Sequence, residues 1–424
     1  MAEDRHFAQN LIRTGAEEDQ SGVHETYRLA QSDGVLTVHR PHSDVISSPD
    51  DQVEPLPDGQ VDLLVRSAEE ATCGGVNMAE LVLDKLIEFK KTSASTEIMR
   101  LHGNHPPSKG AERSFLYEQA GVDFKTPIDD IKPGAVYLFS AHGADPDEID
   151  RAEAQGLWVV DTTCSLVDRV YHHVRRASAE GSDPRETGVL YLAPLYKSDH
   201  PEVVGTRGVV RRAGFSFIPI TGVQDVLQAL DSEDPRSAPV GPEAVSLNGV
   251  KKLLVTGLTT SNAREVLAMA AALQAAAEKH GFDIVPYSSR DVCRTVQYRQ
   301  EAMREVVADA RVATVIIVGA VASNNTTELV RVAVDSFTGR QLDIRYVNHF
   351  SQIPRTVEGG IGVLSGASTQ QRNVDQLVTY LNPTNAEVVG RAEKLDLFRP
   401  LGGGTSLASR ILKGDFTWFG EGVA

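Results

Sequence analysis

The stretch KLLVTGLTTSNAREVLAMAAALQAAAEKHG, residues 252–281, contains the pattern on which most of the chain is built. Its short apolar run is typical of a buried parallel strand, and the small polar residues that follow are typical of a loop. The Ala- and Leu-rich segment after them predicts a helix. The same order recurs at residues 135–156, 313–337 and 360–381. Alternating strands and helices predict parallel sheets covered by helices, so the expected fold class is α/β.

Length and composition indicate a large globular protein. The 424 residues, 41% hydrophobic and 24% charged, leave room for two to four domains or one large α/β unit. No apolar run approaches the roughly 18–20 residues of a membrane span, and the first ten residues contain no apolar signal core. We therefore expect a cytoplasmic protein with no membrane contact. The net charge of −16 argues against nonspecific binding to nucleic acid.

Residues 1–60 differ from the rest of the chain. They contain 12 Asp and Glu residues against 4 Arg and no Lys, which is half of the net charge. Pro, Ser and Asp cluster toward the end of the segment. We expect an acidic extension with some local structure near GVLTVHRPH, residues 34–42, that ends in a loop or linker.

The three cysteines stand far apart in equivalent local settings. Cys73, Cys164 and Cys293 each follow an apolar, β-branched run and precede a helical pattern. This repetition supports an internal threefold repeat with one cysteine in each α/β domain. Three thiolates gathered at one point would form a metal or cluster site with one open position, while three inert, buried cysteines are the alternative. The expected boundaries are 1–60 for the extension, 61–160, 161–285 and 286–382 for the three domains, and 383–424 for a C-terminal tail.

Polar residues follow several of the predicted strands. Because ligands bind beyond the carboxyl ends of parallel strands, these loops are expected to carry the chemistry. Hydroxyls, amides and backbone N–H groups at helix N-termini can hold an anion such as a phosphate or diphosphate, although each Ser or Asn alone is an ordinary helix cap. Neither a GxxxxGK[ST] nor a GxGxxG loop is present. The candidates are His102, His105, Ser140, His142, His200, Glu202, Ser323, Asn324, Asn325, Ser368 and Thr369.

At this point the ordered motifs match a known family. The chain resembles the 4-hydroxy-3-methylbut-2-enyl diphosphate reductases, also called the IspH or LytB family. The resemblance covers about residues 61–382, and its order and spacing are more specific than any single motif. The matching segments are CGGV (73–76), FSAHG (139–143), DTTC (161–164), HPEVVGT (200–206), DVC (291–293) with RQEA (299–302), SNN (323–325) and GAST (366–369).

The resemblance implies three α/β domains around a pseudo-threefold axis. By matching position, Cys73, Cys164 and Cys293 would hold a [4Fe–4S] cluster with one iron left without a cysteine. That iron would bind the hydroxyl of an allylic diphosphate, which two electrons and protons remove as water. The products would be isopentenyl and dimethylallyl diphosphate, and a ferredoxin or flavodoxin would supply the electrons.

The resemblance also implies roles for the polar loops. Glu202 would organise proton delivery, and His200 and Thr259 are assigned to the catalytic site with it. The first-domain histidine is His102 or His105, and His102 is the preferred counterpart. The implied substrate contacts are His102, His105, His142, His200, Ser323, Asn324, Asn325 and Ser368.

Some positions depart from the family pattern. An ungapped alignment places Leu258 where the family has a functional Thr, and displaces Thr259 and Thr260. Tyr298 stands where the family has Asn, and Gln370 where it has Pro. These departures keep open a paralogue with the same cluster and another substrate. A further alternative is a regulatory cluster-binding protein without turnover, although the His200 and Glu202 pair argues for catalysis.

Overall fold

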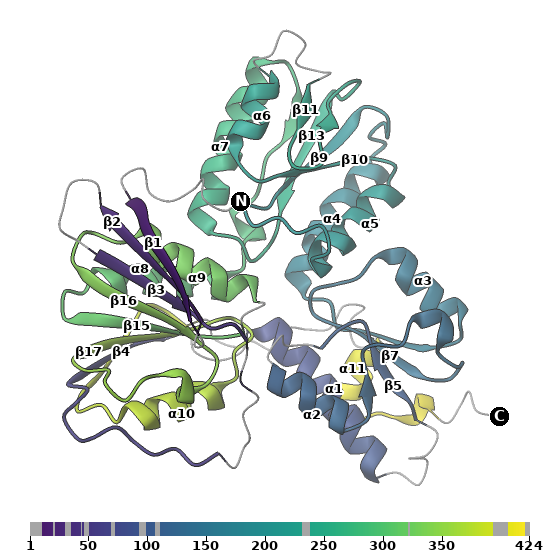
Figure 1. Cartoon of the computed structure of the whole chain (residues 1–424). Helices are drawn as coiled ribbons and strands as arrows, with labels where there is room; N and C mark the ends of the chain where they lie inside the picture. The colour runs from purple at the N-terminus through teal and green to yellow at the C-terminus, as the bar shows by residue number, and fades with distance from the viewer. Residues whose placement is uncertain are drawn as a thin grey trace. The chain divides into compact units, whose positions relative to one another are not determined.

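The structure is a computed structural model of the whole chain (Figure 1). It describes residues 11–19, 22–29, 35–43, 45, 51–68, 73–92, 99–106, 111–230, 238–320, 323–392 and 406–419. The chain divides into two compact units. The first unit comprises Met1–Cys73, Ser108–Leu116 and Arg294–Lys394, and the second comprises Gly74–Pro107, Tyr117–Cys293 and Leu395–Ala424.

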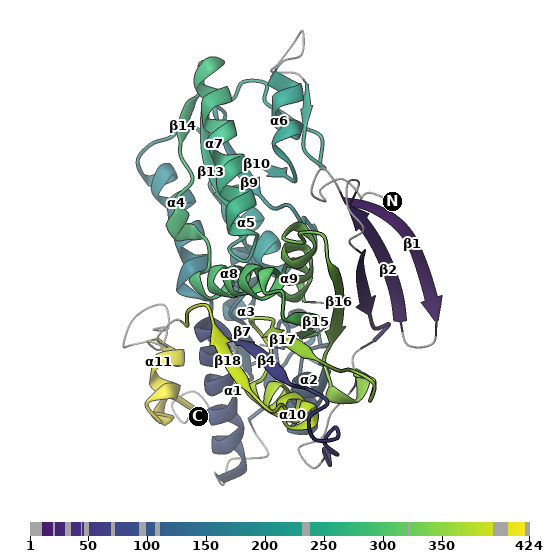
Figure 2. The same cartoon turned by 90° about the vertical axis from the view of Figure 1, so that its left-hand side faces the viewer.

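The first unit is built on one eight-stranded sheet with the order β1-β2-β3-β16-β15-β17-β4-β18. The strands from β3 to β18 pair in parallel, whereas β1, β2 and β3 form an antiparallel meander at one end (Figure 2). The strands are β1 (Leu11–Asp19), β2 (Gly22–Leu29), β3 (Val35–Arg40), β4 (Leu63–Ser67), β15 (Val312–Val318), β16 (Gln341–Val347), β17 (Gly360–Ser365) and β18 (Ala386–Val389).

Helices cover both faces of this sheet. Helices α8 (Arg294–Ala308) and α9 (Asn324–Asp335) pack on one face and α10 (Gln371–Leu381) packs on the other. Successive residues of β15 point to opposite faces, so Val315 contributes to the core under α8 and α9 while Ile316 contributes to the core under α10. This two-sided burial explains why the strands read as unbroken apolar runs.

The second unit contains two four-stranded parallel sheets, with the orders β6-β5-β7-β8 and β10-β9-β13-β14. The first comprises β5 (Leu101–Gly103), β6 (Val122–Asp123), β7 (Val136–Phe139) and β8 (Trp158–Asp161). The second comprises β9 (Thr187–Leu192), β10 (Ser216–Ile220), β13 (Lys252–Gly257) and β14 (Asp283–Val285), and β11 (Pro239–Val240) and β12 (Val245–Ser246) form a small hairpin beside it.

The helices of the second unit pack on these sheets. Helix α1 (Gly74–Thr92) packs on the sheet that contains β7, and α4 (Ser165–Ala179) and α5 (Pro201–Arg212) pack on the sheet that contains β13. The C-terminal segment joins the core beneath α1, where the rings of Trp418 and Trp158 lie 5.3 Å apart. The remaining helices of this unit are α3 (Pro146–Ala154), α6 (Val223–Leu230), α7 (Ala263–Lys279) and α11 (Leu407–Leu412), with short 3₁₀ turns η1 (Ile128–Asp130), η2 (Ser289–Asp291) and η5 (Thr417–Phe419). Helix α2 (Ala111–Gln119) spans the division between the units, and the 3₁₀ turn η3 (Phe350–Gln352) belongs to the first unit.

The α/β fold class with parallel sheets is confirmed, but the sheets divide the chain differently from the expected boundaries. Strand β4 was expected to open the domain of residues 61–160, and it pairs instead with β17 and β18 in the first unit. The expected extension and tail both contribute strands to that same sheet, as β1 to β3 and as β18. Strand pairing depends on residues that are distant in the sequence, so an apolar run alone does not predict which sheet the strand joins.

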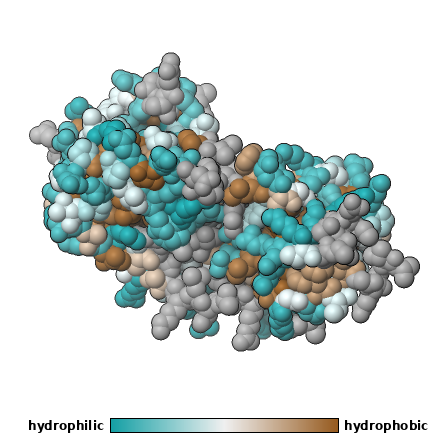
Figure 3. All heavy atoms as spheres, turned by 90° about the horizontal axis from the view of Figure 1, so that it is seen from below, coloured by the Kyte–Doolittle hydropathy of each residue, from teal (hydrophilic) through white to brown (hydrophobic). Residues whose placement is uncertain are grey.

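The face drawn in Figure 3 is largely hydrophilic where its residues are described. On the face drawn in Figure 3, hydrophobic residues lie in small groups among hydrophilic ones. Within the described ranges, no helix combines the length and the apolar character needed to cross a membrane.

Candidate active site

The three cysteines occupy equivalent positions in the fold. Each directly precedes a helix, α1, α4 or α8, and each is half-exposed. The backbone N–H of each cysteine donates to the carbonyl of a residue two positions beyond the end of a parallel strand, β17, β7 or β13. The bonds join Cys73 to Ala367 (2.8 Å), Cys164 to Ala141 (3.0 Å) and Cys293 to Thr259 (2.8 Å). This equivalence agrees with the repeat that the sequence indicated.

The surroundings of Cys164 are shaped by a glycine. A Cβ atom at Gly75, in the first turn of α1, would lie 3.1 Å from the Cys164 sulfur. A side chain at position 75 would therefore crowd this thiol, so the close approach of the two segments favours glycine. Cys164 and Cys293 lie in the second unit and Cys73 in the first. Within the described ranges, no three His, Cys, Asp or Glu side chains are grouped so that they could hold a metal ion.

Three histidines of the second unit form a cluster. The ring centres of His105 and His142 are 4.9 Å apart, and those of His142 and His200 are 6.1 Å apart. The buried Ser140 hydroxyl lies 2.8 Å from Nε2 of His105 and 3.4 Å from Nδ1 of His142. Imidazoles and a hydroxyl in this arrangement present several hydrogen-bond donors to one anion.

Asn104 orders this cluster, although sequence reasoning did not select it. Its Oδ1 accepts hydrogen bonds from the N–H groups of His105 at 2.9 Å and Ser140 at 3.1 Å. One amide therefore joins the loop after β5 to the loop after β7. The sequence offered one signal for Asn104, which is its position next to His105 in the segment LHGNHPP, residues 101–107.

His102 lies elsewhere. It is part of β5, and its Nδ1 is 3.7 Å from a carboxylate oxygen of Asp123. Burial lowers the pKa of His102, and the nearby Asp123 only partly opposes this effect. Strand alternation sends the His102 side chain to the face of the sheet, whereas His105 follows the strand end. The geometry therefore places His105, and not the preferred His102, in the histidine cluster.

Glu202 is a buried acid at the start of α5. His200 is the N-cap of this helix, Pro201 is its first residue, and Glu202 is 1% exposed. The Thr259 N–H donates to Oε1 of Glu202 at 2.7 Å and the Thr259 hydroxyl donates to Oε2 at 3.1 Å. Burial raises the pKa of Glu202 to about 7, against the opposing effect of the two bonds from Thr259. A carboxyl group with this pKa can donate a proton near neutral pH.

Leu258 does not replace the Thr259 contact. Its side chain is buried in an apolar cluster with Tyr191, Ala193 and Val203. The departure from the family pattern therefore places an apolar side chain in the core, and the neighbouring Thr259 supplies the hydroxyl that faces Glu202. Of the other two departures, Tyr298 is half-buried on α8 and Gln370 is the N-cap of α10.

A second group of polar residues lies in the first unit, after the adjacent parallel strands β15 and β17. Ser323 is the N-cap of α9, and Asn324 and Asn325 form its first turn. The Nδ2 of Asn324 and the Oδ1 of Asn325 are buried without a hydrogen-bond partner among the described residues. Ser368 follows β17, and the Thr369 hydroxyl donates to the Val318 carbonyl at 2.9 Å. Amide groups that point inward without partners are suited to a polar ligand.

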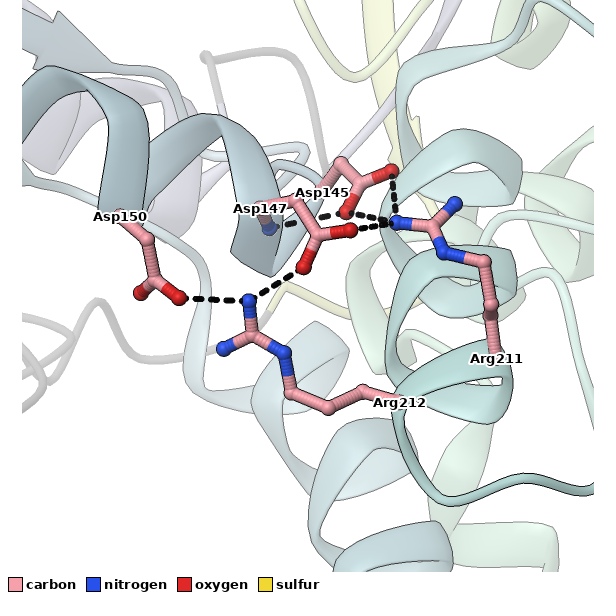
Figure 4. Close-up of polar contacts among 5 residues, drawn as sticks. All are labelled: Asp145, Asp147, Asp150, Arg211 and Arg212. Atoms are coloured by element: carbon pink, nitrogen blue, oxygen red, sulfur yellow. Dashed lines mark hydrogen bonds and ion pairs between the residues drawn. The ribbon is translucent and has the colours of Figure 1, made fainter.

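The far end of α5 is tied to α3 by ion pairs (Figure 4). Arg211 binds the Asp145 carboxylate at 2.9 Å and also pairs with Asp147, and Arg212 pairs with Asp147 and with Asp150 at 2.7 Å. Asp145 caps α3, the helix that follows the His142 loop. The network links the helix that carries Glu202 to the segment that carries His142.

These features define an α/β protein with three equivalent cysteines, a cluster of three histidines and a buried acid. Residues 65–382 match the family model described as LytB protein, and the chain belongs to this family. It is similar to the 4-hydroxy-3-methylbut-2-enyl diphosphate reductase of Tropheryma whipplei, with 26% identity over 309 residues, or 73% of this chain and 86% of that protein. The reductase of the same name from Acidothermus cellulolyticus is 25% identical over 350 residues, or 82% of this chain and 89% of that protein.

A solved structure supports the fold. The E-1-hydroxy-2-methyl-but-2-enyl-4-diphosphate reductase of Plasmodium falciparum is similar with a TM-score of 0.58 and 20% identity. The likeness covers 80% of this chain and 95% of that one.

Proposed function

We propose that the protein reduces (E)-4-hydroxy-3-methylbut-2-enyl diphosphate to isopentenyl and dimethylallyl diphosphate. The observation that carries the proposal is Glu202, a buried acid with a pKa of about 7 that lies two residues after His200, a member of the histidine cluster. Membership of the LytB family and the names of the relatives support the same activity. Each turnover consumes two electrons and two protons, breaks the C–O bond of the hydroxyl group and releases water.

The three cysteines are the proposed ligands of a [4Fe–4S] cluster. Their chemistry fits this group, because thiolates hold iron–sulfur clusters and each thiol precedes a helix whose N-terminus favours the thiolate form. When bound, the cluster supplies electrons and a Lewis-acidic iron that has no cysteine ligand.

The diphosphate is assigned to the polar loops. In the second unit, His105, His142 and His200 offer donors to its oxygens. In the first unit, Ser323, Asn324, Asn325 and Ser368 offer hydroxyl and amide donors from neighbouring strand ends. His102 is not included, because it lies against Asp123.

Glu202 is the proposed proton donor to the leaving hydroxyl group. Burial favours its neutral form, so it holds a proton near pH 7 and can release it as the C–O bond breaks. Thr259 orients the carboxyl group through both of its oxygens. His200, two residues earlier at the helix start, belongs to the same site.

The remaining parts of the proposal concern partners and location. The sequence contains no GxGxxG loop of the kind that binds a nicotinamide cofactor. A ferredoxin or flavodoxin is therefore the proposed electron donor. The proposed location of the protein is the cytoplasm.

The decisive experiment is an anaerobic assay with a one-electron donor and the hydroxymethylbutenyl diphosphate. Protein purified without oxygen is expected to contain about four irons per chain, and Cys164→Ser is expected to lose most of them. Glu202→Gln is expected to keep the iron and lose turnover. A fully loaded protein that does not consume this substrate would exclude the proposal in favour of a paralogue with another substrate.

A further inference from the structure

One buried hydroxyl of the second unit lies between three elements of the candidate site. Tyr171 is on α4, two helical turns after Cys164, and is 4% exposed. Its ring packs among Val167, Val174 and neighbouring apolar side chains. The phenolic oxygen, by contrast, has no hydrogen-bond partner among the described residues. A buried hydroxyl without a partner is costly, which suggests that it is retained for a reason other than packing.

The hydroxyl fits a notch made by two glycines. A Cβ atom at Gly143 would lie 2.3 Å from the Tyr171 oxygen, and one at Gly205 would lie 2.0 Å from it. No side chain larger than hydrogen fits at either position without displacing the tyrosine. Gly143 also has a φ of +81°, a conformation that L side chains rarely adopt. The Tyr171 hydroxyl therefore touches the backbone of two separate segments.

Both segments carry proposed site residues. Gly143 directly follows His142. Gly205 is three residues after Glu202 on α5, so the two lie on the same side of the helix. Burial raises the pKa of Tyr171 well above its usual range, and the Glu202 carboxylate adds to this effect. The hydroxyl thus stays neutral and lies within electrostatic range of the acid.

We propose that Tyr171 is a positioning residue that sets the spacing between His142 and Glu202. The inference rests on the proposed function, in which His142 holds the diphosphate and Glu202 serves the other end of the same substrate. The length of the substrate fixes the separation that the two residues need, and a wrong separation weakens binding because the ligand cannot meet the donors of both segments at once. The Tyr171 hydroxyl acts as a spacer between the His142 loop and α5. It can contact both segments because Gly143 and Gly205 have no side chains.

The test compares Tyr171→Phe with the wild-type chain. Binding of inorganic diphosphate to the cluster-free protein is measured by calorimetry, and KM and kcat are measured on the loaded enzyme. Loss of the spacer is expected to weaken diphosphate binding and raise KM, each by roughly 3–10-fold, with a smaller change in kcat. Tyr137→Phe is the matched control, because Tyr137 is equally buried in a different core cluster of the same unit. It is expected to change the melting temperature but neither affinity nor KM.

A second variant tests the notch itself. Gly205→Ala is expected to weaken diphosphate binding in the wild-type background, because the new methyl group collides with the Tyr171 oxygen. In the Tyr171→Phe background this collision is removed, and the methyl group meets the ring carbon and the Ala144 carbonyl at 3.0 Å instead. The loss caused by Gly205→Ala is therefore expected to be smaller in that background.

The outcomes separate the two proposals. If Tyr171→Phe leaves diphosphate affinity and KM unchanged, or if Gly205→Ala is equally harmful in both backgrounds, Tyr171 is not a spacer. If the wild-type enzyme binds diphosphate but does not reduce the allylic substrate, the proposed reaction fails, while the binding measurements still decide the role of Tyr171.

Discussion

Thr259 holds both carboxylate oxygens of Glu202, with its N–H 2.7 Å from Oε1 and its hydroxyl 3.1 Å from Oε2. The carbonyl of the same residue accepts the N–H of Cys293 at 2.8 Å. One residue of the loop after β13 therefore fixes the buried acid and one of the three cysteines. A change of the Thr259 side chain is expected to alter the acid first, because its hydroxyl bonds to Glu202 whereas Cys293 is bound by the backbone carbonyl.

Thr259→Val is expected to shift the pH dependence of activity. The hydroxyl of Thr259 stabilises the ionised carboxylate, so its loss raises the pKa of Glu202 further. The alkaline limb of the kcat profile then moves to higher pH by roughly one unit, and kcat falls because the carboxyl group is less well oriented. Thr260→Val, at the half-exposed neighbouring position, is the control and should leave the limb in place. If the alkaline limb of Thr259→Val does not shift, the ionisation of Glu202 does not produce that limb.

Glu202→Gln is expected to stabilise the protein at alkaline pH. The folded-state pKa of about 7 lies above the ordinary value of 4.5, so the folded protein keeps a proton that the unfolded chain releases. Folding stability therefore falls as the pH rises between these values and stays low above them. At pH 8 the neutral amide avoids this loss, a gain on the order of 3 kcal/mol, whereas at pH 4 the two proteins should be similar. Denaturant unfolding at both pH values measures the difference, and equal stabilities at pH 8 would contradict the raised pKa.

Gly75→Ala is expected to reduce iron loading. The added methyl group would lie 3.1 Å from the Cys164 sulfur, which is tighter than ordinary packing. Iron and sulfide content after anaerobic reconstitution, with circular dichroism to confirm folding, measures the effect. Gly15→Ala is the matched control, since a Cβ atom there has no neighbour within 4 Å. Normal iron loading of a folded Gly75→Ala protein would show that a methyl group beside the Cys164 sulfur does not hinder cluster assembly.

His105→Ala and His102→Ala are expected to differ in their affinity for diphosphate. His105 lies 4.9 Å from His142 between ring centres, whereas His102 pairs with Asp123. Loss of one charge-assisted hydrogen bond at His105 should weaken inorganic diphosphate binding by about tenfold. His102→Ala should change affinity by less than twofold. Calorimetric titration of the cluster-free protein measures both affinities. If His102→Ala weakens diphosphate binding more than His105→Ala does, His102 is the histidine that binds diphosphate.

The α/β class could be predicted because its signal is local. The apolar strand before Thr259 and the amphipathic helix after it can both be recognised from the spacing of apolar residues within 30 positions. Each buried strand is a run of apolar residues whichever strands it pairs with. The positions of the cysteines and of His142, His200 and Ser323, between a strand and the helix that follows it, come from the same pattern. These features depend on residues close together in the chain, so the sequence alone determined them.

The tertiary structure decided what depends on distant residues. It placed β4 beside β17, selected His105 rather than His102 for the histidine cluster, and joined Glu202 to Thr259 across 57 positions of sequence. The pKa of Glu202 and the fit of Tyr171 against two glycines arise from the same long-range packing. Pairing, burial and close contact are properties of neighbours in space, and the local pattern of strands and helices does not specify which neighbours these will be.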